Sequence, residues 1–160
     1  MVSRSLVPFS SVASNLFSTA AARLAKHLQE RERRSRSVIG VLQRIDFGLH
    51  VCQALILAPT REVANQIQKI GLALGDYEGV RCRSGIGGTS VRDDMDKLRE
   101  GQHLVVGTHG RAIDVISKHH HRVDDLIIFV LDEADEMLSR GFKGQIYDIF
   151  KCLPPKLRAM

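Results

Sequence analysis

The sequence predicts an α/β fold built on a parallel sheet with helices on both faces. After residue 37, short apolar runs alternate with longer amphipathic runs, which is the pattern of βαβ units. The run LIIFVL at 126–131 is uninterrupted by polar residues, as expected of a buried strand. With 160 residues, 44% of them hydrophobic, the chain is long enough for one domain with its own core.

The N-terminal segment differs from the rest in composition. Residues 1–29 contain Ser, Ala, Leu, Phe and basic side chains, and the first acidic residue is Glu30. This composition is typical of a mitochondrial transit peptide, although unrelated upstream sequence or a disordered tail would share it. The charged run 30–36 is predicted to be a solvated linker. We therefore expect a basic N-terminal segment at 1–37 and a folded domain at 38–160.

The charge and the cysteines exclude several classes of protein. The net charge of +5 arises in residues 1–37, where seven Lys/Arg face two Asp/Glu, so the remainder is neutral overall. Cys52, Cys82 and Cys152 are far apart, which favours neither a zinc site nor a disulfide framework. No apolar run approaches the roughly 20 residues of a membrane span, and we expect no membrane partner.

The elements of the domain follow from the spacing of apolar residues. Recurrence every three or four positions predicts a helix, and a short apolar run bounded by turn residues predicts a strand. In chain order we predict a helix at 37–47, a strand at 53–58, a helix at 61–74, a strand at 80–84, a glycine loop at 85–88, a helix at 91–99, a strand at 103–106, a helix at 110–117, a strand at 126–131 and helical structure up to Pro154.

The residues after the last predicted strand carry the strongest chemical signal. In open α/β sheets, ligands bind at the carboxyl ends of the strands. Here Asp132, Glu133 and Asp135 follow an apolar strand, and clustered carboxylates are costly there unless a cation or hydrogen bonds hold them. With a magnesium nucleotide, Asp132 would hold the metal and Glu133 would orient or deprotonate a water. Alternatively, the acidic side chains only complement the dipole of the following helix.

Two further strand ends favour contact with phosphates. Thr60 and Arg61 follow one strand, and Thr108 and Arg111 follow another, each just before a predicted helix. Helix N-termini beside arginines present amide donors and positive charge to phosphate groups. Together with the loop at Gly87 and Gly88, these corners could follow the backbone of a single nucleic-acid strand without contacting its bases.

These motifs together resemble the DEAD-box family of ATP-dependent RNA helicases, and especially its translation initiation factor 4A group. PTREVA at 59–64 resembles the family's PTRELA motif, and IGG at 86–88 its double glycine. GTHGR at 107–111 resembles the TPGR motif, and VLDEADEML at 130–138 the DEAD motif. Their order and spacing are those of the family, and the resemblance covers about residues 38–155.

The resemblance implies a RecA-like sheet and a role for each motif residue. Asp132 and Glu133 would serve hydrolysis of ATP with Mg²⁺, with Asp132 at the metal through water. Ala134 and Asp135 would join the network between the nucleotide and RNA sites. The residues implied to contact the RNA backbone are Pro59, Thr60, Arg61, Gly87, Gly88, Thr108, Gly110 and Arg111.

The resemblance also bears on partners and compartment. It implies single-stranded RNA as a partner, with translation-initiation scaffold or exon-junction proteins as further ones, and a monomeric chain. It implies a cytoplasmic or nuclear protein, whereas the composition of residues 1–29 favours mitochondria.

Four departures from the family pattern limit what we expect of the chain. The family has AxxGxGKT before the SVIGVLQRI helix, and here the segment is RERRSRS, with no glycine and no GK pair. The adenine-recognising Gln motif is also unrecognisable. The chain ends at Met160, before the SAT motif and the second RecA-like domain. His109 replaces the proline of TPGR, which removes a fixed φ and is expected to loosen that corner.

We therefore expect a truncated first RecA-like domain with no useful ATPase activity of its own and an open sheet edge beside 126–131. A non-enzymatic module that binds RNA or a partner, and a chain that does not fold stably, remain alternatives. The run His119–His121 is expected to be a solvated loop, since metal binding needs convergent ligands.

Overall fold

The computed structural model describes residues 9–85, 100–118, 124–139 and 141–159. The chain divides into two units, residues 1–34 and 35–160, which are described separately. Three predicted features lie outside the described residues: the glycines Gly87 and Gly88, the helix at 91–99, and the His119–His121 loop. Among the helices that are described, none is both long and apolar enough to cross a membrane.

The first helix, α1, runs from Phe9 to Leu42 and is longer than the sequence predicted. The segment 30–36 is part of this helix, so the predicted linker there is wrong. Glutamate and arginine are good helix formers, and Glu30 lies one turn from both Lys26 and Arg34, at 3.9 Å from each. Opposite charges four residues apart can pair along one face of a helix, so this charged segment is helical.

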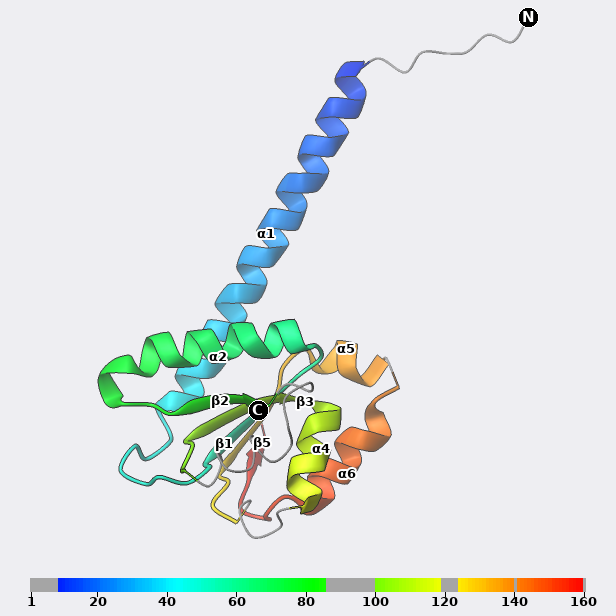
Figure 1. Cartoon of the computed structure of the whole chain (residues 1–160). Helices are drawn as coiled ribbons and strands as arrows, with labels where there is room; N and C mark the ends of the chain where they lie inside the picture. Colours follow the sequence, from blue (N-terminus) through cyan, green and yellow to red (C-terminus); the bar gives the residue numbers. More distant parts are fainter. Residues whose placement is uncertain (1–8, 86–99, 119–123, 140, 160) are drawn as a thin grey trace, which may run out of the picture. The chain divides into compact units, whose positions relative to one another are not determined.

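The second unit is built on a five-stranded sheet in which every pair of neighbouring strands is parallel. The strand order is β2-β3-β1-β4-β5. The chain therefore starts at the central strand β1, passes over β3 to reach β2, and later passes over β1 between β3 and β4 (Figure 1). The four predicted strands are all present, with their ends displaced by one or two residues. The strands are β1 Ala54–Ala58, β2 Cys82–Gly85, β3 Leu104–Thr108, β4 Ile128–Leu131 and β5 Arg158–Ala159.

The edge beside β4 is occupied by a strand that the sequence did not predict. Arg158 pairs with Ile128, and Ala159 pairs with Phe129. The expectation of an open edge beside 126–131 is therefore wrong for the first half of β4. The pattern of apolar residues could not show β5, because two residues are too few to establish any periodicity.

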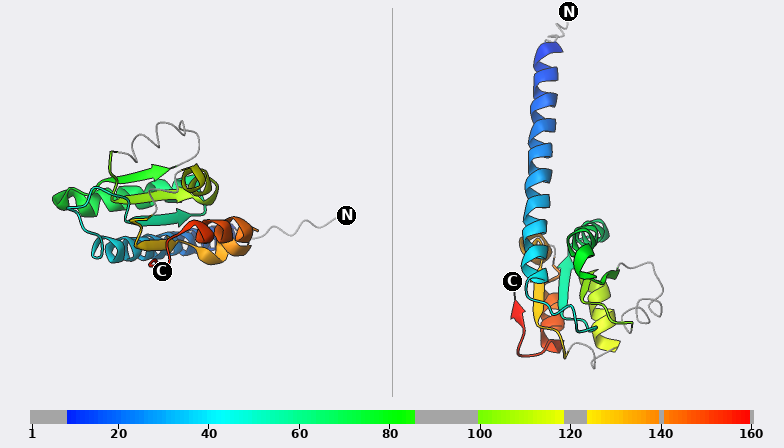
Figure 2. Two further views of the ribbon diagram at one scale, coloured as in Figure 1. Left: turned by 90° about the horizontal axis from the view of Figure 1, so that it is seen from below. Right: turned by 90° about the vertical axis from the view of Figure 1, so that its left-hand side faces the viewer.

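Helices cover both faces of the sheet, as predicted. Alternate residues of a strand point to opposite faces, and every residue of β1 is buried, so the central strand needs cover on both sides. Figure 2 shows α2 on one side of the sheet and α4 and α6 on the other. The helices of the second unit are α2 Arg61–Gly75, α4 His109–Lys118, α5 Ala134–Ser139 and α6 Lys143–Cys152, with a short 3-10 helix, η1, at Asp76–Glu78.

The two faces bury separate apolar clusters. On one face, the part of α1 after residue 35 and α2 contribute Val38, Val41, Ala64 and Ile67 to the core. The other face packs α4, α5 and α6 against the sheet around Phe129. The sheet thus lies between two helical layers, and packing on both faces positions the residues that follow its strands.

Candidate functional site

The pairing of the strands brings the predicted motifs to one edge of the sheet. Ala58 at the end of β1 lies beside Thr108 at the end of β3, and Leu57 lies beside Leu131 at the end of β4. Gly85, the last residue of β2, pairs with Gly107. The residues after β1, β3 and β4 therefore start from neighbouring positions, although they are separated by up to about seventy residues of sequence.

The corner between β1 and α2 has the predicted helix cap. Thr60 is extended, with φ −134° and ψ 159°, and its Oγ1 accepts a hydrogen bond from the Val63 amide at 3.3 Å. Pro59 is buried, whereas Arg61, the first residue of α2, is exposed. The N-terminal amides of a helix have no partner within it, so this corner offers donors and an exposed cation to an anionic ligand.

The corner between β4 and α5 separates the three carboxylates. Asp132 is only 7% exposed, and its amide donates to the Leu57 carbonyl at 2.9 Å, which continues the pairing with β1. Glu133 is half-buried, and Asp135 in the first turn of α5 is exposed. The three acidic side chains therefore have different surroundings, and Asp132 is the one held at the end of the sheet.

Glu133 has a backbone conformation that is unusual for its residue type. Its φ is +52°, and among the described residues it is the one non-glycine residue with a positive φ. The left-handed region costs a residue with a side chain about 1–2 kcal/mol. The Glu133 carbonyl accepts from the Met137 amide at 3.1 Å, so this conformation turns the chain directly from β4 into α5. The strain lies at the position where the sequence predicted a catalytic carboxylate.

The carboxylates of Asp132 and Glu133 at this edge are of a kind that suits magnesium. Carboxylate oxygens suit Mg²⁺, which usually takes one or two of them and completes its shell with water and phosphate. The described residues contain no cluster of three or more Asp, Glu, His or Cys placed to hold a metal by themselves. Residues 30–36 lie within α1, where interior amides are engaged in the helix, so they form no phosphate loop.

The corner between β3 and α4 contains a contact that the sequence did not predict. His109 begins α4, and its ring stacks on Phe142, with ring centroids 3.8 Å apart and 29° between the planes. Burial lowers the pKa of His109 below its usual value, so the ring is neutral at neutral pH. Beside it, Gly110 is exposed, and Thr108 and Arg111 are half-buried. Phe142 carried no signal of its own in the sequence.

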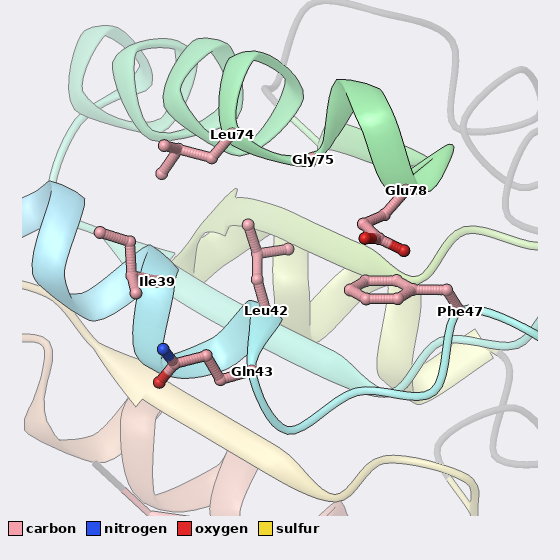
Figure 3. A pocket seen from close by; sticks show the side chains of 7 residues that line it. All are labelled: Ile39, Leu42, Gln43, Phe47, Leu74, Gly75 and Glu78. Atoms are coloured by element: carbon pink, nitrogen blue, oxygen red, sulfur yellow. The ribbon is translucent and has the colours of Figure 1, made fainter.

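A hollow of about 300 Å³ lies elsewhere in the second unit. Figure 3 shows it between the last turns of α1 and the end of α2, with the Phe47 and Glu78 side chains at one end. Since α2 starts at the carboxyl edge of the sheet and runs away from it, this hollow lies away from the candidate site. It is lined by Ile39, Leu42, Gln43, Phe47, Leu74, Gly75 and Glu78.

A family model and curated relatives that resemble the sequence of this chain all point to the same family. Residues 13–160 match the family model described as DEAD/DEAH box helicase. Eukaryotic initiation factor 4A of Cryptosporidium parvum is 65% identical over 117 residues, which are 73% of this chain and 29% of that protein. Eukaryotic initiation factor 4A-1 of Arabidopsis thaliana is 60% identical over 119 residues, again 29% of its length. The chain thus spans less than a third of these curated relatives.

Solved structures give the same result for the fold. A DEAD box protein from the hyperthermophile Methanococcus jannaschii superimposes with a TM-score of 0.74 at 28% identity, over 79% of this chain and 34% of that one. The yeast DEAD-box splicing factor Prp28 gives a TM-score of 0.60 at 32% identity, over 68% of this chain and 27% of that one. The sheet and its helices are therefore those of known RecA-like domains.

Proposed function

The chain belongs to the DEAD/DEAH box helicase family, and from this we propose that it binds the backbone of single-stranded RNA at the carboxyl edge of its sheet. We place it in an ATP-dependent RNA helicase of the initiation factor 4A group, acting in translation initiation or RNA processing. The pairing of Ala58 with Thr108 carries the proposal, since it sets the Thr60–Arg61 and Thr108–Arg111 corners side by side.

The chemistry of the two corners supports binding to the backbone. Each pairs a helix N-terminus with an arginine, and both features attract phosphate groups. Contacts of this kind position a nucleic-acid strand but do not distinguish its bases. We therefore expect weak dependence on RNA sequence and strong dependence on salt.

We also propose that this chain does not hydrolyse ATP by itself. The family generally uses ATP with Mg²⁺, and Asp132 with Glu133 would supply the carboxylates. Phosphoryl transfer depends almost entirely on positioning and charge stabilisation, and the helical segment 30–36 offers no loop for the phosphates. A chain that binds RNA without hydrolysing ATP would compete with active helicases for it.

Binding to RNA is tested with the variant Arg61→Ala/Arg111→Ala and a labelled single-stranded oligouridine. We expect fluorescence anisotropy to show an affinity about tenfold or more below that of the native chain. The slope of log affinity against log salt should fall by about 1.4, since each lost phosphate contact on a single strand removes about 0.7.

The control for this experiment removes the same charge elsewhere. Arg44 and Lys69 are exposed, and Arg44 precedes β1, at the opposite end of the sheet from the candidate site. The variant Arg44→Ala/Lys69→Ala should bind RNA much as the native chain does. Equal losses in the two double variants would show general attraction to a basic protein, and would count against a site at this edge.

Hydrolysis of ATP is tested by measuring phosphate release with and without RNA. We expect the full 160-residue chain and its Glu133→Gln variant to give the same rate. Without a loop that binds the phosphates, Glu133 cannot direct a water at the γ-phosphate. Stimulation by RNA that disappears in Glu133→Gln would refute the proposed inactivity.

A further inference from the structure

The corner between β3 and α4 lacks the proline that the resemblance leads one to expect. A proline at the first residue of a helix restricts φ to the helical value, and so holds the entry to the helix. His109 has no such restriction. Because Thr108 and Arg111 flank it in the proposed RNA site, the means by which this corner is held affects the binding of RNA.

The His109 side chain is anchored by a contact across space. Its ring stacks on Phe142 at 3.8 Å between centroids. Its Nδ1 is buried, and no hydrogen bond to it is found in the described part of the chain. A half-buried neutral imidazole whose Nδ1 has no hydrogen-bond partner there presents mainly an aromatic surface, which suits the stack on Phe142.

Phe142 is itself held firmly. It follows Gly141, whose φ is +85°, and it is the N-cap of α6. Its carbonyl accepts from the Ile146 amide at 3.0 Å, and α4 packs against α6 along the same face of the sheet. A ring that stacks on Phe142 is thereby tied to the segment that follows the acidic residues at 132–135.

We propose that His109 is a positioning residue that holds the Thr108–Arg111 corner in its RNA-binding geometry by stacking on Phe142. A proline would hold the start of α4 through its fixed φ, whereas His109 holds it through contact with Phe142. This contact also joins the RNA corner to the start of α6, which follows Asp132 and Glu133 in the chain. This inference rests on the proposed binding of RNA, and it assigns a role to a side chain that differs from the family pattern.

The test uses the full chain with His109→Ala, Phe142→Ala, the double variant and His109→Phe. We expect each alanine variant to bind oligouridine about two- to tenfold more weakly, the range expected for one lost aromatic pair. The double variant should be no weaker than either single variant, because the two residues act through one contact. His109→Phe keeps an aromatic ring and should bind as the native chain does.

A second readout does not depend on RNA. Because α4 begins at His109, helix geometry pairs the amides at 113–115 with the carbonyls at 109–111. The Ile146 amide donates to the Phe142 carbonyl, so its exchange follows the state of the Phe142 backbone. Their hydrogen exchange, followed by NMR, should accelerate in His109→Ala and stay native in His109→Phe.

The two readouts separate the possible failures. If His109→Ala leaves exchange and affinity native, or if His109→Phe is as impaired as His109→Ala, the inference is wrong. If the native chain does not bind RNA while His109→Ala still accelerates exchange at both sites, then binding of RNA fails and the positioning contact stands.

Discussion

Replacing Phe129 by alanine is expected to lower the free energy of unfolding by about 3–5 kcal/mol, as is usual for a buried phenylalanine. Phe129 lies in β4 and is 1% exposed, in the cluster formed with α4, α5 and α6. A domain of this size is stable by only about 5–15 kcal/mol, so the substitution should remove a large share of its stability. Urea denaturation followed by circular dichroism at 222 nm measures the loss.

Phe150 provides the matched control for this substitution. The two rings form an edge-to-face pair with centroids 4.8 Å apart, so either alanine variant removes that pair. Phe150 is 40% exposed, and its removal leaves a space that water can enter. Phe150→Ala should therefore cost much less than Phe129→Ala. Equal losses would mean that the aromatic pair, and not the burial of Phe129 between the sheet and its helices, determines the stability here.

Replacing Gly101 by alanine is expected to cost about 2–5 kcal/mol, the sum of a left-handed backbone and an overpacked contact. Gly101 has φ +84°, and an added Cβ would overlap the His50 carbonyl oxygen and lie 2.8 Å from the His50 Cβ. The segment around His50 leads into β1, where Gln53 and Ala54 both donate to the His103 carbonyl. The clash therefore displaces the start of the β1 and β3 pairing.

Two other glycines separate the causes of this loss. Gly79 and Gly141 also have positive φ, at +65° and +85°, but nothing lies within 4 Å of an added Cβ at either. Gly79→Ala and Gly141→Ala should each cost only the backbone term of about 1–2 kcal/mol. If Gly101→Ala costs no more than these two in urea denaturation, the overlap with His50 is relieved without displacing the strands.

The local features of this protein were predictable from its sequence. Helices follow from apolar residues that recur every three or four positions, and strands from short apolar runs between turn residues, and both patterns depend only on near neighbours. Thr60 was recognisable as a helix cap for the same reason, since its partner Val63 lies three residues away. The acidic residues after LIIFVL were placed at a strand end by this reasoning alone.

One local prediction failed because composition was taken as evidence of a linker. The segment 30–36 is rich in charge, and the structure has it within α1. Its glutamates and arginines are good helix formers, and their spacing also permits ion pairs along one helix face, so charge alone does not distinguish a linker from a solvated helix.

Other features were decided by contacts between residues that are distant in the sequence. The order β2-β3-β1-β4-β5 sets Ala58 beside Thr108, fifty residues later, and periodicity along a strand carries no information about its neighbour. The stack of His109 on Phe142, thirty-three residues later, arises in the same way. The sequence by itself determined which residues stand at the strand ends, because those rules act over a few residues. The tertiary structure alone brought them to one edge, because hydrogen bonding and burial across the sheet select which strands meet.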